Sequence, residues 1–344
     1  MSRFRDEIGE QPRVAGRLLL AAAPAVEAIA NRLRASRPNG FLIAARGSSD
    51  HAALYAKYLF GRRNRALVSL AAPSLFTHYA SPPRLAGSCV IGISQSGASP
   101  DVIAVVEEAR RQGCLTVAIT NEADSRLAEA ADLVVALEAG PERSVPASKT
   151  YTASLLAMAL ISQAIDPDPE FAAALARVPR ALAAALGLDE ELDRLVPALL
   201  GPRAVVLGRG FNLSTAEEVA LKLTETGYVL ARAWSVADFE HGPIAVVEAG
   251  FPVLLVGSGG PVAADFGGIA ERLAEYGCRL IGLFDGAAGP LEAEATVRLN
   301  SGLPEELTPL TLAVLGQLLA HRVALALDID PDRPRALNKV TRTW

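Results

Sequence analysis

The sequence contains two similar halves, and this internal repeat constrains the fold more than any other feature. Arg46-Gly47 in "GFLIAARGSSDHAALYAKYLF" matches Arg209-Gly210 in "RAVVLGRGFNLSTAEEVALKL", and Gly113-Cys114 matches Gly277-Cys278. The offset is about 163 residues, which is the length of a domain. Between these matches, "SCVIGISQSG" lines up with "FPVLLVGSGG". Three matches in the same order predict two related units in tandem.

Each half alternates short apolar runs with stretches of helical period. In the first half, "FLIAA", "CVIGIS", "LTVAIT" and "DLVVAL" are typical of buried parallel strands that helices cover on both faces. The stretch "ASPDVIAVVEEARRQG" predicts a helix with Ser99 as N-cap, Pro100 at its first position and Gly113 at its end. The pattern predicts an α/β fold with two tandem doubly wound parallel sheets, each in three αβα layers.

The chain of 344 residues is long enough for two domains. Two prolines in "AIDPDPEF" interrupt the pattern, and an Ala/Leu-rich helical stretch follows them. We expect an N-terminal helical arm (1–36), a first subdomain (37–165), a helical linker (166–190), a second subdomain (191–330) and a C-terminal tail (331–344).

Composition excludes several classes of function. The formal net charge of −5 provides no basic field for nucleic acid or an anionic membrane. The charged N-terminus lacks a signal-peptide core, and no run of 18 uncharged apolar residues occurs. Three isolated cysteines form no CxxC pair. These features predict a soluble, cytoplasmic protein without disulfides.

We expect neither a metal nor a nucleotide cofactor. No group of His, Asp or Glu in the sequence has the spacing of metal ligands. The turn "GRGFNL" also lacks the remaining glycine of a dinucleotide-binding fingerprint.

Two turns of the first half are rich in hydroxyl groups where a strand gives way to a helix. The turn "ISQSGASPD" provides Ser94, Gln95, Ser96 and Ser99, and "ARGSSDHAA" provides Gly47, Ser48 and Ser49. Helix N-termini carry free N–H groups and a partial positive charge, and ligands of doubly wound sheets bind at this edge. We therefore predict a phosphate site here. The alternative is that these serines only cap helices.

These two turns resemble the sugar-isomerase (SIS) domains, whose serine-rich loop holds the phosphate of a phosphosugar. The stretches "EIGEQP", "VVLGRGFNLSTAEEVALKLTETGY", "DFEHGPIAVV" and "PRALNKVTRTW" resemble the isomerase half of glutamine–fructose-6-phosphate aminotransferase. The resemblance covers nearly the whole chain. That family's glutaminase domain, with its N-terminal cysteine nucleophile, has no counterpart here, so we expect no use of glutamine by that route.

The resemblance implies roles for four residues. Glu225 corresponds to the glutamate that transfers a proton between C2 and C1, and Lys222 lies one turn earlier on the same helix face. His241 corresponds to a histidine that opens the sugar ring from the neighbouring subunit of a homodimer. Lys339 corresponds to a lysine of the tail that closes over the sugar. Without the resemblance, the first pair would be interpreted as a solvated ion pair and Lys339 as a solubilising residue.

The sequence departs from the family pattern at two places. Where relatives often have Val-Ala-Ser-Thr-Lys, this chain has "SVPASK", so Ser148 and Lys149 remain as candidate sugar contacts. The second half has "VGSGGPVAAD" instead of a serine-rich turn. We therefore expect the second half to have lost phosphate binding, which leaves one sugar site per chain.

The leading hypothesis is an enzyme that converts glucosamine 6-phosphate to fructose 6-phosphate and ammonia by C1–C2 proton transfer. Its ligand is a hexose or hexosamine 6-phosphate. Another phosphosugar isomerase, or a deglycase of fructosamine phosphates, is the alternative within the same class. A non-catalytic phosphosugar sensor is the alternative of a different class; the retained Glu225, His241 and Lys339 favour catalysis.

Overall fold

The computed structural model describes residues 2–287 and 293–339. The chain divides into two compact units. The sheet-A unit comprises residues 13–142, 149–176 and 338–339, and the sheet-B unit comprises residues 2–12, 143–148 and 177–337 without the undescribed segment. Residues 340–344 of the predicted tail lie outside the described residues, and the five segments predicted from the sequence stay a prediction.

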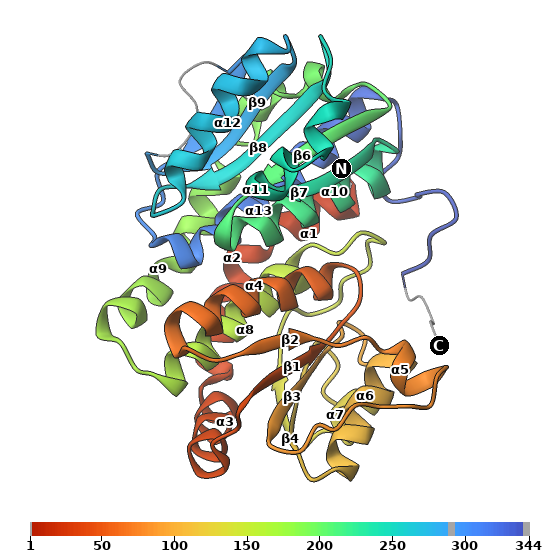
Figure 1. The fold of residues 1–344 in the computed structure, drawn as a ribbon, viewed down its shortest axis with the longest axis vertical. Helices are drawn as coiled ribbons and strands as arrows, with labels where there is room; N and C mark the ends of the chain where they lie inside the picture. The colour runs from red at the N-terminus through yellow and green to blue at the C-terminus, as the bar shows by residue number, and fades with distance from the viewer. Residues whose placement is uncertain (1, 288–292, 340–344) are drawn as a thin grey trace. The chain divides into compact units, whose positions relative to one another are not determined.

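The sheet-A unit contains a five-stranded parallel sheet (Figure 1). Its strands are β1 (Gly40–Ala44), β2 (Val68–Leu70), β3 (Ser88–Ile93), β4 (Leu115–Thr120) and β5 (Leu133–Ala136). They lie in the order β2-β1-β3-β4-β5. The order reverses between β1 and β3, and the turns that follow these two neighbouring strands are the hydroxyl-rich ones.

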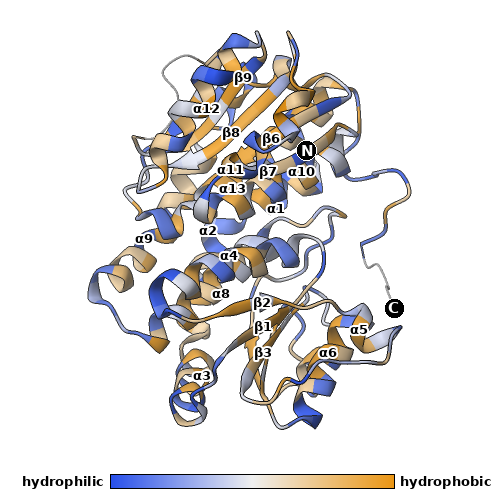
Figure 2. Ribbon diagram, in the orientation of Figure 1, coloured by the Kyte–Doolittle hydropathy of each residue, from blue (hydrophilic) through white to orange (hydrophobic). Residues whose placement is uncertain are grey.

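Helices cover both faces of this sheet. They are α3 (Ala23–Ser36), α4 (Ser48–Asn64), α5 (Ser74–Thr77), α6 (Pro100–Arg111), α7 (Arg126–Ala130) and α8 (Lys149–Ile165); α2 (Gln11–Ala21) and α9 (Pro169–Leu186) run across the unit boundaries. Helix α6 begins at Pro100 after the N-cap Ser99, as predicted. Ala44, Val90 and Ala118 of the strands pack against α6 and α7 in one buried cluster. Figure 2 shows these strands as mainly hydrophobic.

The sheet-B unit repeats the same topology. Its strands are β6 (Arg203–Gly208), β7 (Leu230–Ser235), β8 (Pro252–Ser258), β9 (Arg279–Asp285) and β10 (Ala295–Leu299). The order β10-β9-β8-β6-β7, read from the other edge, reproduces the connectivity of sheet A, and all pairs are parallel. The prediction of two tandem doubly wound parallel sheets is therefore confirmed.

The helices of the sheet-B unit include two that pack closely together, α10 and α13. The helices are α1 (Arg3–Gly9), α10 (Leu213–Gly227), α11 (Val236–Glu240), α12 (Ala263–Glu275) and α13 (Thr308–Ala326); the short 3₁₀ helices are η1 (Glu190–Arg194), η2 (Val196–Leu199), η3 (Gly210–Asn212), η4 (Pro243–Val246) and η5 (Glu305–Leu307). On the α11–α12 side of the sheet, Phe239, Phe266 and Phe284 anchor a buried apolar cluster.

Helix α13 is unusually apolar. By length and composition, Glu305–Ala326 could cross a membrane, and α2 with α3 would pass the same test only as one span bent by 54°. However, 83% of the apolar window of Glu305–Ala326 is buried within the folded chain. The packing of α13 is that of a core helix.

Candidate active site

Backbone hydrogen bonds fix the serine-rich turn after β3 to β4 and α7: the Ser94 N–H donates to the Ile119 carbonyl, and the Gly97 carbonyl accepts from the Leu127 N–H. The Ser94 and Ser99 hydroxyl oxygens lie 3.1 Å apart, and Ser96 Oγ accepts a hydrogen bond from the Ala98 N–H. Gly97 has φ +59°, and a Cβ there would lie 2.0 Å from Ser125 Oγ. A side chain at this position would therefore displace the turn.

The turn after β1 joins the first one through an ion pair. Gly47 (φ +56°) precedes α4, whose first residues are Ser48 and Ser49, and all three are at least partly exposed. The neighbouring Arg46 Nε donates to Asp101 Oδ2 at 2.6 Å, and Asp101 is fully buried in the first turn of α6. The Arg46–Asp101 pair thus ties the two hydroxyl-rich helix starts to each other.

The electrostatics of these turns depend on dipoles more than on charged side chains. The guanidinium of Arg46 is bound to Asp101. Burial raises the pKa of Asp50 above its ordinary value, although His51 and Arg46 partly oppose this shift. The Gln95 carbonyl accepts a hydrogen bond from the Asn121 N–H, which fixes the turn to the end of β4. An anion here would be bound by backbone N–H groups and hydroxyls.

A buried charge cluster lies on α10 in the sheet-B unit. Lys222 Nζ lies 2.5 Å from Glu225 Oε2 and 3.5 Å from Glu218 Oε1. The side chains of Lys222 and Glu218 are 1% exposed, whereas that of Glu225 is 23% exposed. The pair is therefore not a solvated surface pair. A fixed carboxylate that solvent and ligands can reach is suited to accept a proton and return it.

His241 ends the short helix α11. Its backbone N–H donates to Asp238 O, and Gly242 (φ +145°) turns the chain into η4. The imidazole is exposed and has no contact with Lys222 or Glu225 among the described residues of this chain. Its predicted position in a partner's site stays a prediction.

Lys339 is paired within the sheet-A unit. Its Nζ donates to Glu142 Oε2 at 2.8 Å, and the Glu142 side chain is fully buried. The same carboxylate accepts hydrogen bonds from the backbone N–H (3.1 Å) and hydroxyl (2.8 Å) of Thr150 at the start of α8. A lysine of the predicted tail is therefore held by a desolvated carboxylate.

The two candidate sugar contacts are buried in this structure. Lys149 is 1% exposed, and its Nζ donates to the Pro141 carbonyl at 2.8 Å. Ser148 is fully buried, and its carbonyl accepts a hydrogen bond from Gln317 Nε2 at 3.3 Å. A direct contact of either side chain with a sugar would need a rearrangement of this segment.

The second half has a different cleft at the equivalent edge of its sheet. A cavity of about 350 Å³ is lined by Ser258 at the end of β8 and Gly259 after it, by Asp285 at the end of β9, and by Glu305 of η5 and Thr308 at the start of α13. Two carboxylates and a glycine-rich turn here contrast with the serines of the first half.

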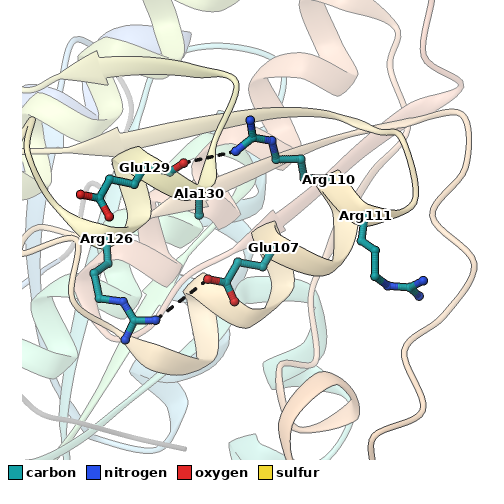
Figure 3. A pocket seen from close by; sticks show the side chains of 6 residues that line it. All are labelled: Glu107, Arg110, Arg111, Arg126, Glu129 and Ala130. Carbon is teal, nitrogen blue, oxygen red and sulfur yellow. Dashed lines mark hydrogen bonds and ion pairs between the residues drawn. The ribbon is translucent and has the colours of Figure 1, made fainter.

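A further pocket lies on the outer side of α6 and α7 (Figure 3). It measures about 500 Å³, and Arg126 lies 4.0 Å from Glu107 across it, while Arg110 Nη1 donates to the Glu129 carbonyl. Arg111 points away from the other side chains. Its arginines are mostly exposed, so we assign it no catalytic role.

The sequence analysis missed three residues of these clusters. Glu218 stands four residues before Lys222, a spacing that brings side chains together on a helix and could have indicated it. Asp101 and Glu142 find their partners 55 and 197 residues away, and no local pattern predicts such pairs. Among the described residues, no group of three or more His, Cys, Asp or Glu could hold a metal ion.

Comparison with known proteins identifies a family domain in each half of the chain and relatives that match nearly all of it. The profile of the SIS domain matches residues 37–163 and 201–327. The glutamine–fructose-6-phosphate aminotransferase of Thermococcus kodakarensis is 32% identical over 343 residues, which cover 97% of this chain and 56% of that protein. The chain therefore spans about half the length of the curated relatives it matches.

Two solved structures match nearly the whole chain. A candidate phosphosugar isomerase of Silicibacter pomeroyi DSS-3 is 35% identical with a TM-score of 0.89, covering 96% of this chain and 100% of that one. Glucosamine-6-phosphate deaminase of Thermotoga maritima shares the fold, with 20% identity, a TM-score of 0.78 and coverage of 99% and 100%. With its two similar sheets and two matched segments, the chain belongs to the SIS domain family.

Proposed function

We propose that the protein is a phosphosugar aldose–ketose enzyme that converts glucosamine 6-phosphate and water to fructose 6-phosphate and ammonia. The buried Lys222, fixed between Glu218 and Glu225, carries this proposal. Of these three side chains, only that of Glu225 is more than 1% exposed, so its carboxylate combines the fixed geometry with access to a ligand. In this proposal, Glu225 takes the proton from C2 of the open-chain sugar and returns it to C1.

The nitrogen leaves after the proton transfer. Moving the C2 proton to C1 converts the open-chain amino-aldose into a ketimine with its C=N bond at C2. Water adds to that carbon, the C–N bond breaks, and ammonia departs as the C2 ketone forms. His241 is assigned to ring opening, since an exposed imidazole can act as a general acid and base. Lys339 is assigned to the charge that develops on the sugar oxygens.

The two turns of the sheet-A unit are assigned to the phosphate. The Arg46–Asp101 pair joins helix starts that offer Ser48, Ser49, Ser94 and Ser99 to one anion. This assignment needs no net positive charge on the chain, because hydroxyls and helix N–H groups supply the donors.

We propose further that the protein acts as a homodimer in which His241 of one chain serves the partner. The exposed position of His241 and its lack of contact with the α10 cluster support this arrangement. The names of the relatives support the phosphosugar class.

The test is an assay of the purified protein with glucosamine 6-phosphate, without glutamine or added metal. We expect ammonia and fructose 6-phosphate to appear in equal amounts. Glu225→Gln should abolish turnover but keep binding of the sugar phosphate, measured by thermal shift. Glu190→Gln makes the same chemical change at an exposed residue of the sheet-B unit and should leave turnover unchanged.

Other outcomes would separate the alternatives. Stabilisation by glucosamine 6-phosphate without turnover would reject the deaminase and favour an isomerase, deglycase or sensor of another phosphosugar. The absence of both turnover and stabilisation would reject the assignment of the serine turns. Full turnover by Glu225→Gln would reject the proton-transfer role.

A further inference from the structure

A second cavity of ligand size lies in the sheet-B unit. Its lining residues are distant in the sequence from the α10 cluster. We call it the tail-base cavity: it measures about 630 Å³ and is lined by Arg5, His321, Leu325, Asp328, Asp330 and Asp332, among others. It lies where α13 ends and the tail begins, beside α1. Small-molecule sites commonly measure about 300–1,000 Å³, so this cavity can hold a small organic molecule.

The buried imidazole of His321 is the observation that indicates a ligand. The residue is 8% exposed, and its Nε2 is buried with no hydrogen-bond partner among the described residues. Buried polar atoms are normally paired, because an unpaired one loses its hydrogen bonds to water. Burial lowers the pKa of His321, so the imidazole is neutral near pH 7 and one ring nitrogen keeps a lone pair.

The charges around the cavity favour a cation. Arg5 and Arg322 both pair with Asp189, and Arg322 also pairs with Asp193, so two carboxylates balance the two guanidiniums. Asp332 accepts the N–H groups of Arg3 and Phe4, and Asp330 accepts the N–H of Asp332.

Asp328 remains available for a ligand. Its carboxylate has no hydrogen bond or ion pair within the part of the chain that the structure describes. Asp330 also lies 3.9 Å from Arg333 Nε. The lining itself carries three carboxylates and one guanidinium, which disfavours an anion.

Two aliphatic side chains also line the cavity. Leu325 is 56% exposed although it belongs to a helix that is otherwise mostly buried, and Ile329 also lines the cavity. An aliphatic chain laid on these two side chains would remove apolar surface from water.

We propose that the tail-base cavity binds a primary aliphatic amine, whose ammonium donates to Asp328 and to the neutral imidazole of His321 while its chain covers Leu325 and Ile329. An ammonium has three donors and no acceptor, which fits a lining that offers acceptors. A metal ion fits less well, since no described group of three or more ligating side chains could hold one. This proposal does not depend on the proposed catalytic activity.

The test uses three probes with the same five-carbon chain: n-pentylamine, 1-pentanol and pentanoate. Each is titrated into the full chain at low salt, and backbone and imidazole ¹⁵N signals are followed by NMR. We expect pentylamine to shift the signals of residues 325–332 and the imidazole of His321. Pentanol should bind more weakly, and pentanoate should leave these signals unchanged.

Variants make the test specific. Asp328→Asn keeps a residue that tolerates the φ of +56° at this position and should weaken pentylamine binding by about threefold. Asp124→Asn makes the same change at an exposed residue of the sheet-A unit and should not alter it. Pentanoate binding as tightly as pentylamine, an affinity unchanged by Asp328→Asn, or shifts confined to other residues would each overturn the proposal.

Discussion

At the scale of single residues, Lys222 shows most clearly how neighbouring carboxylates stabilise a buried charge. It is almost completely buried between Glu218 and Glu225. Lys222→Met keeps the aliphatic chain but leaves the buried Glu218 without its cation, and breaking a buried pair in this way costs about 3–5 kcal/mol. We therefore expect the free energy of unfolding, measured with urea, to fall by this amount.

A double variant isolates the charge effect. Glu218→Gln added to Lys222→Met removes the stranded charge, so it should recover part of the lost stability. An equal loss in the single and double variants would show that packing, and not charge, dominates at this position.

His321 makes a second residue-scale prediction, for stability against pH. Its pKa is lowered, first by burial; Arg5 and Arg322 act in the same direction, whereas Asp189 and Asp332 oppose them. In the unfolded chain a histidine has a pKa of about 6.5. Below that pH the unfolded state binds a proton that the folded state resists, so stability falls as pH decreases.

The measurement compares urea unfolding of the protein and His321→Gln between pH 5 and 8. On acidification, the free energy of unfolding of the variant should fall less than that of the wild type. The difference is up to about 1.4 kcal/mol per pH unit between the pKa of His321 in the unfolded chain and its lower pKa in the folded chain. Parallel curves would contradict the assigned role of His321 burial. The ionisable groups other than His321 are the same in both proteins, so their own contributions cancel to first order in the comparison.

At the scale of secondary-structure elements, two matched ion pairs provide an internal control. Arg46–Asp101 ties the turn after β1 to α6, and Arg209–Asp265 ties the turn after β6 to α12, with Nε–Oδ2 distances of 2.6 and 2.7 Å. Only the first pair lies beside hydroxyl-rich turns. Loss of Arg46 would remove this cation from the buried Asp101 and loosen both turns.

We expect Arg46→Gln to weaken binding of a hexosamine 6-phosphate by about tenfold. Arg209→Gln, the same change in the second half, should leave binding unaltered. Isothermal titration of both variants checks this. An equal loss in the two would show that the pairs act on the fold generally and would remove the phosphate assignment from the first half.

The central strands could be predicted from the sequence because short apolar runs indicate strands that are buried on both faces. Strands β1, β3, β4 and β5 match "FLIAA", "CVIGIS", "LTVAIT" and "DLVVAL" to within one residue at each end, and α6 begins directly after its predicted N-cap. The edge strand β2 has three residues of which only Val68 is buried, so no run marks it. The serine turns could be predicted from their place between strand and helix, and Glu225, His241 and Lys339 came from a resemblance. Asp101 and Glu142 depend on long-range folding, so no local pattern indicates their partners.

At the scale of the whole molecule, the proposed homodimer makes its own prediction. If His241 serves the partner's site, Glu225→Gln and His241→Asn are each inactive but complement each other when mixed. Random pairing of subunits gives half heterodimers, each with one intact site, so the mixture should recover about a quarter of full activity. Mixing the folded variants after dissociation and assaying ammonia tests this. No recovery despite verified exchange would place His241 in its own chain's site.

The path of the chain has a consequence for how such a protein can be divided or inherited. The chain passes from one unit to the other after residues 12, 142, 148, 176 and 337. No single cut in the gene separates two complete units: a fragment that stops before residue 177 still carries residues 2–12 and 143–148 of the sheet-B unit. Gene fission or the loss of one half would therefore damage both units, and we expect evolution to keep or discard them together.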